Sequence, residues 1–265
     1  MFPTTPFSCL KTGVASFLLI VLSTGTVLTL SSCVSTGKKG KKTPGIEDPA
    51  SIPGPPPLPT SVGTQDSYSK VNTTRPCLAL TFDDGPHATN TPRLLDLLKA
   101  RNVKATFFVV ATNAKRYPEI MRRIVAEGHE IGNHTVTHTA LTKMSDSAIR
   151  QELTSSHEAI QSITGVAPRT MRPPYGAITA TQKSWIRRDF GYPAILWSVD
   201  PEDWKKPGAS VVTSRLVSGA KPGGILLVHD IHSASIDAMP STIDQLLAKG
   251  FQFVTVTQLI AMDGK

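Results

Sequence analysis

Residues 78–86 read Leu-Ala-Leu-Thr-Phe-Asp-Asp-Gly-Pro, and this stretch decides the fold class. Its first five residues form an unbroken, mostly apolar run, which is typical of a strand that is buried on both faces. The run stops at two acidic residues followed by Gly-Pro, a dipeptide that marks a turn. We therefore predict a strand of a parallel sheet, with carboxylates placed where the strand ends.

Strand-like and helix-like segments alternate along the chain after this stretch. Further strands are expected at residues 105–111, 130–134, 170–172, 194–199, 225–229 and 252–256. Helices are expected at residues 91–100, 118–127, 145–163, 180–189, 210–218 and 241–247. Apolar strands that alternate with helices indicate parallel strands and an α/β architecture. About seven parallel strands in this order predict a small, distorted (β/α) barrel.

Ionisable and polar residues follow five of these strands at the point where each strand ends. They are Asp83 and Asp84, His134 and His138, Arg172, Asp200 and Asp203, and His229 and Asp230. Each alone has a structural explanation, since Asp-Asp-Gly-Pro is most often a turn and a single histidine is usually structural. The loops after barrel strands converge on one face, where active sites of such barrels lie. Their joint placement therefore predicts one concave site.

The residue types at these strand ends suit a hydrolytic metal site. Two imidazoles and one carboxylate bind a divalent ion and leave a position open for water or substrate. His134 and His138 stand one helical turn apart, or can surround one ion from a turn. Asp83 and Asp84 are adjacent, so in extended backbone they point to different sides. One can bind metal while the other serves as a base, and the sequence leaves open which does which.

Five motifs in this order resemble the polysaccharide deacetylases of carbohydrate esterase family four, the NodB homology domain. The motifs are Thr-Phe-Asp-Asp-Gly-Pro at 81–86, His-Thr-Val-Thr-His at 134–138, Arg-Pro-Pro-Tyr at 172–175, Asp-Pro-Glu-Asp-Trp at 200–204 and Leu-Val-His at 227–229. The resemblance runs from about residue 71 to residue 260. A single motif would be weak, but five in the right order are highly specific.

The resemblance implies a metal site and an acid–base pair. It assigns Asp84, His134 and His138 to one divalent metal ion, zinc being favoured and cobalt or nickel being alternatives. It makes Asp83 the general base and His229 the general acid. No position of this set departs from the family pattern, which argues against an inactive relative.

The same resemblance implies roles for residues around that centre. Arg172 would orient the base and keep it ionised, and Asp203 would pair with the acid histidine. The backbone N–H of Tyr175 would help to hold the oxyanion. Asp200 would be a supporting carboxylate near Arg172. The expected substrate contacts are Trp204 as a groove wall, Leu227 in the pocket for the acetyl methyl group, and Pro173 together with Tyr175.

The N-terminus reads as an export signal. Lys11 precedes an apolar run at 14–30, and Leu-Ser-Ser-Cys at 30–33 resembles a bacterial lipobox, which implies lipidation of Cys33. An ordinary signal peptide with a chance cysteine, or an uncleaved anchor helix, are the alternatives. Residues 34–70, rich in Lys and then in Pro and Gly, predict a flexible tether. The deacetylase domain would span residues 71–265. This places the protein in the cell envelope, at the outer membrane or periplasmic face rather than the cytoplasmic membrane.

Composition narrows the partners. The net charge of +8 comes in part from a lysine cluster at 38–42. The sequence has no stripe of Arg and Lys interleaved with aromatic residues, so no nucleic-acid-binding groove is predicted. Of three cysteines, Cys9 lies in the signal and Cys33 would be lipidated, so Cys77 has no disulfide partner and is expected to be buried filler. No oligomerisation signal stands out, and we expect a monomer.

The expected activity is removal of N-acetyl groups from an envelope polysaccharide, with peptidoglycan-type N-acetylglucosamine favoured. An O-acetyl esterase acting on a xylan-type glycan would use the same residues, and a non-catalytic glycan-binding lipoprotein is a second alternative. Four further side chains are assigned on their sequence context. Trp185 and Trp197 are expected in the core, His87 in a loop, and His232 within reach of the glycan.

Overall fold

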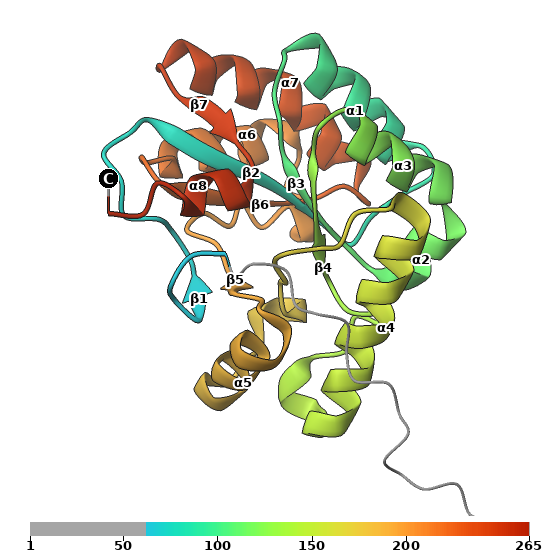
Figure 1. The fold of residues 1–265 in the computed structure, drawn as a ribbon. Coiled ribbons are helices and arrows are strands. Elements are labelled where there is room, and N and C mark those ends of the chain that lie inside the picture. Colours follow the sequence, from blue (N-terminus) through green and yellow to red (C-terminus); the bar gives the residue numbers. More distant parts are fainter. Residues whose placement is uncertain (1–61, 265) are drawn as a thin grey trace, which may run out of the picture. The chain divides into compact units, whose positions relative to one another are not determined.

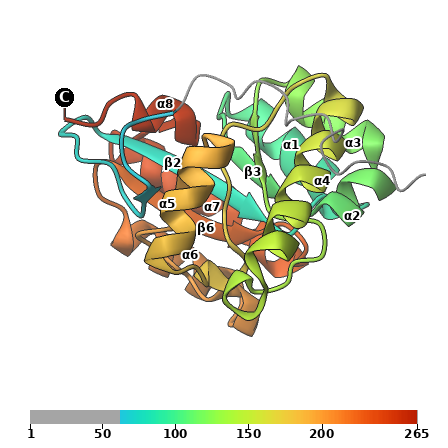
Figure 2. The same cartoon turned by 60° about the horizontal axis from the view of Figure 1, so that its bottom comes forward.

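The strand predicted at the 78–86 stretch is present as β2 (Cys77–Asp83), which is fully buried and pairs with β3, β6 and β7. The computed structural model describes residues 62–264 (Figure 1). Strand β6 (Gly224–His229) runs parallel to β2 along residues 78–83. On the other side, β7 (Gln252–Val254) pairs with the first half of β2 and β3 (Thr106–Val109) with the second half. Figure 2 shows β2 and β6 side by side between the helices.

The remaining strands close the sheet into a distorted barrel. Strand β4 (Glu130–Asn133) pairs with β3, and single parallel bridges connect Met171 to β4 and to β5 (Ala194–Ile195). A further parallel bridge joins Val199 to Leu226 of β6. The predicted α/β class with parallel strands and distorted barrel geometry is therefore confirmed.

Two predicted strands are shorter than expected, and for the second of them the physical reason is a side chain. The run at 170–172 is reduced to the bridge at Met171, and the run at 194–199 is interrupted after Ile195. The guanidinium of Arg172 donates hydrogen bonds to the carbonyl oxygens of Ile195 and Leu196, each at 3.1 Å. Backbone acceptors that a ladder would use are thus bonded to a buried side chain instead.

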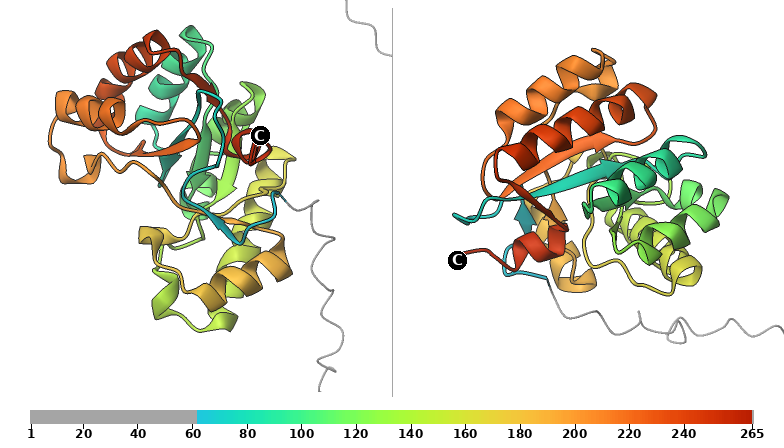
Figure 3. Two further views of the ribbon diagram at one scale, coloured as in Figure 1. Left: turned by 90° about the vertical axis from the view of Figure 1, so that its left-hand side faces the viewer. Right: turned by 90° about the horizontal axis from the view of Figure 1, so that it is seen from above.

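Helices cover the outside of the sheet (Figure 3). They are α1 (Asn90–Ala100), α2 (Ala111–Arg116), α3 (Pro118–Ala126), α4 (Asp146–Thr164), α5 (Ala180–Phe190), α6 (Ala209–Gly219), α7 (Ser233–Ala248) and α8 (Val256–Ile260). The sequence predicted six of them, with α7 eight residues longer at its start than expected, and missed α2 and α8. Both missed helices are single short turns, too short for a helical repeat of apolar residues to show. Within residues 62–264, no helix combines the length and apolarity that crossing a bilayer requires.

Alternation along β2 decides which of its side chains face the barrel interior. Leu78, Leu80 and Phe82 belong to the apolar core that packs against the outer helices. The intervening residues Thr81 and Asp83 point to the interior, where both contact the buried guanidinium of Arg172, the hydroxyl at 2.8 Å and the carboxylate at 2.6 Å. The period of two thus delivers one carboxylate of the 78–86 stretch to the inside of the barrel.

The folded part begins earlier than the predicted boundary at residue 71. Strand β1 (Ser67–Tyr68) pairs with β5, and Val62 and Tyr68 are buried beside α8. The Tyr68 hydroxyl accepts hydrogen bonds from the N–H groups of Thr64 and Gln65. A two-residue strand in polar sequence gives no periodic signal, so this segment was assigned to the tether. The predicted signal peptide, Cys33 and the rest of the tether lie outside the described residues.

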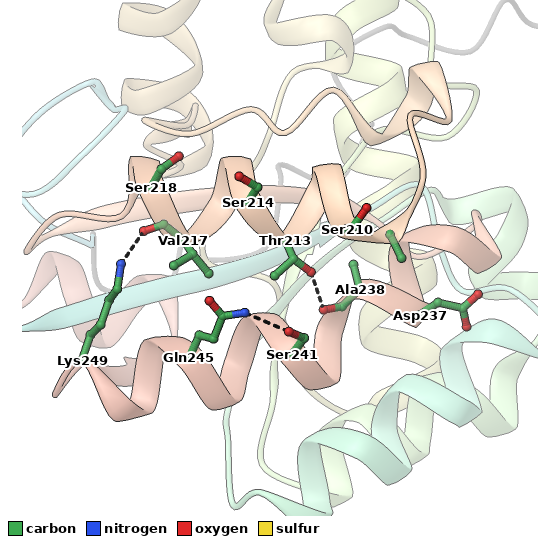
Figure 4. A pocket seen from close by; sticks show the side chains of 11 residues that line it. Ser210, Thr213, Ser214, Val217, Ser218, Asp237, Ala238, Ser241, Gln245 and Lys249 are labelled. Carbon is green, nitrogen blue, oxygen red and sulfur yellow. Dashed lines mark hydrogen bonds between the residues drawn. The ribbon is translucent and has the colours of Figure 1, made fainter.

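A surface groove lies between α6 and α7 (Figure 4). Its volume is about 520 Å³, and serines from both helices line it. The hydroxyl of Thr213 donates to the carbonyl of Ala238 at 3.1 Å, and Lys249 Nζ donates to the carbonyl of Val217 at 3.3 Å. These bonds tie the two helices to each other, and we read the groove as part of the packing of the outer layer.

Candidate active site

A pocket of about 370 Å³ lies at the carboxyl ends of the barrel strands. It is lined by Asp83, Asp84, His134, His138, Tyr175, Trp197, Asp200, Trp204, Leu227, His229 and His232. The structure therefore brings together residues that the sequence predicted to converge from separate strand ends. Arg172 and Asp203 lie behind this surface, each bonded to a side chain that lines it.

Asp84, His134 and His138 form a group that can hold a metal ion. One ligand atom from each residue lies within 4.8 Å of the other two. The Oδ1 atom of Asp84 is 3.4 Å from Nε2 of His134 and 3.1 Å from Nε2 of His138. This oxygen is buried and has no hydrogen-bond partner among residues 62–264, as expected of an atom reserved for a ligand.

The orientation of His134 fits metal binding. Its Nδ1 lies 2.7 Å from the carbonyl oxygen of Arg172, so Nδ1 carries the proton and Nε2 presents a lone pair to the pocket. The ring is 2% exposed, which fixes it in place. Two imidazole nitrogens and one carboxylate suit zinc, cobalt or nickel rather than calcium or magnesium. The residues present therefore fit the divalent ion that the sequence implied.

Backbone geometry separates the two adjacent aspartates. Asp83 ends β2 in extended conformation, whereas Asp84 adopts φ 73°, in the left-handed region. This turn directs Asp84 to the two histidines, while Asp83 remains in the barrel interior against Arg172. The structure thus places Asp84 in the ligand group and Asp83 beside it, with its Oδ2 3.8 Å from Nε2 of His134.

Arg172 is completely buried and holds Asp83. Its Nη1 donates to Oδ1 of Asp83 at 2.6 Å, and its guanidinium lies 4.2 Å from the centre of the Phe108 ring. Burial lowers the pKa of Arg172, and the charge of Asp83 opposes this. Its other bonds go to backbone carbonyls and to Thr81, so each of the three guanidinium nitrogens has a partner. This contact fixes the Oδ1 atom of Asp83 in the barrel interior.

His229 and Asp203 form a second charged pair across the pocket. The Nδ1 atom of His229 lies 2.8 Å from Oδ1 of Asp203, and its backbone N–H donates to Oδ2 at 2.9 Å. The hydroxyl of Ser235 donates to the same Oδ2 at 2.6 Å, so Asp203 is oriented on both oxygens. Burial alone would lower the pKa of His229, but the Asp203 carboxylate outweighs it and raises that pKa to about 9. The imidazole is therefore protonated at neutral pH, with Nε2 available to donate a proton.

Two aromatic side chains stand exposed at the pocket mouth. Tyr175 is 71% exposed and its ring lies edge-on to His138, with centroids 4.7 Å apart. It adopts φ 61° in a turn closed by the N–H groups of Gly176 and Ala177, so the Tyr175 N–H is not used by those turn bonds. Trp204 is 50% exposed and also lines the pocket. Flat, exposed rings beside a polar cavity suit the faces of sugar rings.

Two of the sequence assignments, those of Pro173 and Trp197, need correction, and those of Asp200 and His87 gain detail. Pro173 is buried behind the turn and does not line the pocket. Asp200 lines the pocket, and its Oδ1 accepts the N–H of Glu202 at 2.7 Å. Trp197 lines the pocket and is absent from the buried core residues. His87 does more than occupy a loop.

The imidazole of His87 caps helix α1. Its Nδ1 accepts the N–H groups of Thr89 and Asn90 at 3.3 and 3.2 Å. These are donors that a helix start leaves without partners inside the helix. The expectation for His232 is compatible with the structure, since it lines the pocket with its ring 6.2 Å from that of His229. Trp185 and Cys77 are buried, as expected.

Asp230 lies behind the pocket and explains the glycine of the first motif. It is fully buried, and one of its oxygens accepts the hydroxyl of Thr91. Burial, together with the charges of Asp84 and Asp83, raises the pKa of Asp230 to about 7. A Cβ atom at Gly85 would lie 2.4 Å from both carboxylate oxygens of Asp230, so no other residue fits there without a shift.

Comparison with known proteins gives consistent matches. The family model described as polysaccharide deacetylase matches residues 70–195. The chain is 39% identical over 228 residues to the peptidoglycan-N-acetylglucosamine deacetylase PgdA of Listeria monocytogenes, covering 80% of this chain and 48% of that protein. It is 40% identical over 186 residues to a peptidoglycan-N-acetylglucosamine deacetylase of Bacillus cereus, covering 69% of this chain and 67% of that protein.

A solved structure extends the likeness to the fold. The crystal structure of the Bc1960 peptidoglycan N-acetylglucosamine deacetylase, in complex with an N-hydroxybenzamide compound, matches with a TM-score of 0.70 at 37% identity. The match covers 74% of this chain and 93% of that one. The chain spans about half the length of the PgdA protein, so the two share one region and not their whole sequences.

Proposed function

Because the chain belongs to the polysaccharide deacetylase family, we propose that it hydrolyses N-acetyl groups on an envelope polysaccharide, releasing acetate and leaving free amines. Peptidoglycan-type N-acetylglucosamine is the favoured substrate. One observation carries the proposal: an arginine-paired carboxylate, a carboxylate-paired histidine and a three-residue metal group line the same pocket. Amide hydrolysis needs a base, an acid and stabilisation of an oxyanion, and this pocket offers residues for each.

Asp84, His134 and His138 would hold the metal ion, with zinc favoured. When bound, the ion would polarise the acetyl carbonyl and lower the pKa of water from about 15.7 toward about 7. One of the three ligands is already fixed by another bond, since Nδ1 of His134 is bonded to the Arg172 carbonyl.

Asp83 is the proposed general base. Its carboxylate would accept a proton from the attacking water as the water oxygen bonds to the acetyl carbon. Arg172 occupies Oδ1, which leaves Oδ2 on the side of the metal group. The arginine therefore orients the base, while the free oxygen takes the proton.

His229 is the proposed general acid. Its Nε2 would give a proton to the sugar nitrogen as the bond from that nitrogen to the acetyl carbon breaks. Asp203 fixes the ring through Nδ1, so the proton to be donated sits on the nitrogen that faces the pocket. The backbone N–H of Tyr175 would donate to the oxyanion, a contribution of roughly 3–4 kcal/mol for a well-placed donor.

The pocket walls suit a pyranose with a small acyl group. Leu227 is apolar and 3% exposed at the pocket floor, which fits the acetyl methyl group. Trp204, Trp197 and the ring of Tyr175 offer faces to sugar rings, and Asp200 offers an acceptor to a hydroxyl group. Pro173 shapes the turn of Tyr175 rather than contacting substrate.

The pH dependence of the reaction should follow the His229–Asp203 pair. A raised pKa of about 9 keeps the acid protonated below that pH, so kcat/KM should fall as pH rises through that region. A divalent ion at Asp84 would cancel the part of the His229 pKa shift that the Asp84 charge contributes. The alkaline fall of kcat/KM should therefore be centred somewhat below pH 9 in the metal-loaded enzyme. Asp203→Asn should move this alkaline fall toward the ordinary histidine pKa of about 6.5. It should therefore lower kcat/KM at pH 8 by roughly 30-fold.

A pH–rate profile of acetate release, measured for wild type and Asp203→Asn with equal metal content, checks this prediction. Glu202→Gln is a suitable control, because Glu202 precedes Asp203 but pairs with Lys205 and Arg215 at the surface. An alkaline limb that stays in place in Asp203→Asn would show that the proton on His229 does not limit the reaction.

The same proposal includes a cellular location and an oligomeric state for the protein. Residues 1–33 would direct export, and lipid on Cys33 would anchor the chain in the cell envelope. Residues 34–61 would act as the tether from that anchor to the folded part, which begins by Val62. We propose a monomer, and the outer membrane or periplasmic face as its location. Radiolabelled palmitate incorporation, lost in Cys33→Ala, tests the anchor.

The deciding experiment for the substrate is a comparison of acetate release. The protein from residue 62 onward, loaded with zinc, would be offered peptidoglycan, chitin oligosaccharides and acetylated xylan, each with a chelated control. Chelator-sensitive release from peptidoglycan supports the proposal. Release from xylan alone would establish the O-acetyl esterase instead, and tight glycan binding without release from any of the three would establish the binding role.

A further inference from the structure

The turn that joins the two histidine ligands is held in an unfavourable backbone conformation. Thr135 has φ 66° and His138 has φ 58°, so two non-glycine residues within four lie in the left-handed region. A β-branched residue such as threonine is a genuine outlier there. Such conformations persist only where the surroundings over-determine them. The contacts that fix this turn therefore decide where the imidazole of His138 lies.

Glu152 of helix α4 bonds to the turn through both carboxylate oxygens. Its Oε2 accepts the backbone N–H groups of Val136 at 2.8 Å and Thr137 at 2.9 Å. Its Oε1 accepts the hydroxyl of Thr137 at 3.0 Å. The two backbone donors belong to two of the three residues between the histidines. One side chain thus satisfies the middle of the turn while touching neither ligand.

Asn133 ties the start of the same turn to the same helix. Its Oδ1 accepts the N–H of Thr135 at 2.8 Å, and its Nδ2 donates to the carbonyl of Leu153 at 2.9 Å. Asn133 is completely buried at the end of β4. The turn is therefore fastened to α4 at neighbouring positions, directly by Glu152 and through Asn133 by Leu153.

Helix α4 is a firm support for these contacts. Ser145 caps its start, where the side chain accepts the N–H of Ala148, and Gly165 ends it at φ 74°. Ile149 and Leu153 are fully buried beneath it. Glu152 is half-buried, and every bond described for its carboxylate goes to the turn. No salt bridge involves Glu152 in the part of the chain that the structure describes, so a role in surface charge pairing does not explain it.

We propose that Glu152 is a positioning residue for the metal site, which sets the conformation of the 135–138 turn and thereby the placement of His138 relative to His134 and Asp84. The inference rests on the ligand assignment in the proposed function. Residues that orient metal ligands from behind typically change metal affinity 10–100-fold when they are lost. Glu152 acts as a hydrogen-bond acceptor here, and its charge is not required.

Glutamine separates those two properties. Glu152→Gln keeps the size of the side chain and one oxygen that can accept both backbone N–H groups, and its amide N–H₂ can donate to the Thr137 hydroxyl. Glu152→Ala removes all three bonds. We expect zinc affinity to fall roughly 10–100-fold in Glu152→Ala and to stay within a few-fold of wild type in Glu152→Gln. Glu158→Ala is the matched control, because Glu158 is an exposed residue of the same helix with no described hydrogen bond.

Zinc affinity would be measured by competition with a chelating dye, and the visible spectrum of the cobalt-loaded protein would report ligand geometry. Glu152→Ala should alter both, while Glu158→Ala should alter neither. A folded Glu152→Ala protein with wild-type zinc affinity and cobalt spectrum would overturn the proposal. Equal losses in the Gln and Ala variants would overturn it too, because charge and not hydrogen bonding would then be what matters.

Two further measurements keep the test decisive. If Glu152→Ala does not fold, Thr137→Val removes one of the three bonds at an exposed position; a few-fold loss of zinc affinity supports the proposal and unchanged affinity overturns it. Wild type and His138→Ala test the ligand assignment itself. Zinc binding that is absent from wild type, or retained in His138→Ala, would refute that assignment. Failure confined to the Glu152 variants would refute only the positioning role.

Discussion

Asp83→Asn should lower acetate release by roughly 10²–10⁴-fold while the metal stays bound, which is the range in which general acid–base groups contribute. Asparagine has nearly the volume of aspartate, so the pocket keeps its shape. It cannot accept the proton of the attacking water at neutral pH. Asp83 is also not among the three ligands, because the left-handed conformation of Asp84 separates the two carboxylates.

The same substitution should also destabilise the fold. Arg172 is completely buried, and its Nη1 would face an amide in place of a carboxylate. Removing one partner of a buried ion pair typically costs about 3–5 kcal/mol, since the other charge stays buried without compensation. Asp237→Asn is the control for a generic loss of an aspartate: it breaks an exposed pair with Arg93, and exposed pairs contribute about 0–1 kcal/mol.

The measurements are kcat on a glycan substrate, zinc content and the urea midpoint, at a temperature where all variants are folded. A large loss of kcat with full zinc content supports Asp83 as the base. Near-normal kcat in Asp83→Asn would move the base elsewhere in the pocket. Loss of zinc together with activity would show that Asp83, and not Asp84 alone, belongs to the ligand set.

The fold was predictable where buried segments show a regular spacing of apolar residues in the sequence. The apolar runs at β2 and β3 and the helical spacing of α1, α3 and α4 are long enough to be read from one sequence, and the structure places these elements within one or two residues. The strand expected at 194–199 was not, because it is interrupted where the guanidinium of Arg172 bonds to the carbonyls of Ile195 and Leu196. Such a side-chain contact is a property of the assembled barrel.

The site was predictable in its membership but not in its geometry. Strand ends converge by topology, so the grouping of the aspartates with the histidines and Arg172 followed from the order of elements. The division of labour between Asp83 and Asp84 depends on one backbone angle at Asp84, which sequence does not reveal. Glu152 was not singled out at all. It lies on a helix 14 residues beyond His138, and only the packing of α4 against β4 brings it to the turn.

His134→Ala should abolish tight metal binding, with a loss of affinity beyond the roughly 10–100-fold typical of residues that act behind the ligands. His134 contributes one of only two imidazoles in the group, and its Nε2 faces Asp84 Oδ1 at 3.4 Å. Acetate release should fall with the metal, because the remaining pair, Asp84 and His138, cannot hold an ion firmly at an open pocket. Activity restored by excess zinc would indicate weakened binding rather than a lost acid or base.

The fold should survive His134→Ala better than it survives Asp83→Asn, and this difference separates the two roles. Removal of the imidazole leaves the Arg172 carbonyl without one hydrogen bond but leaves the Arg172–Asp83 pair intact. The expected cost to the metal-free protein is about 1–3 kcal/mol, the usual consequence of an unsatisfied buried acceptor. His157→Ala is the control, a half-buried histidine that is bonded to the Tyr192 hydroxyl and does not line the pocket. If zinc content and acetate release both persist in His134→Ala, the ligand assignment is wrong, and the proximity of Asp84 to the two imidazoles reflects hydrogen bonding alone.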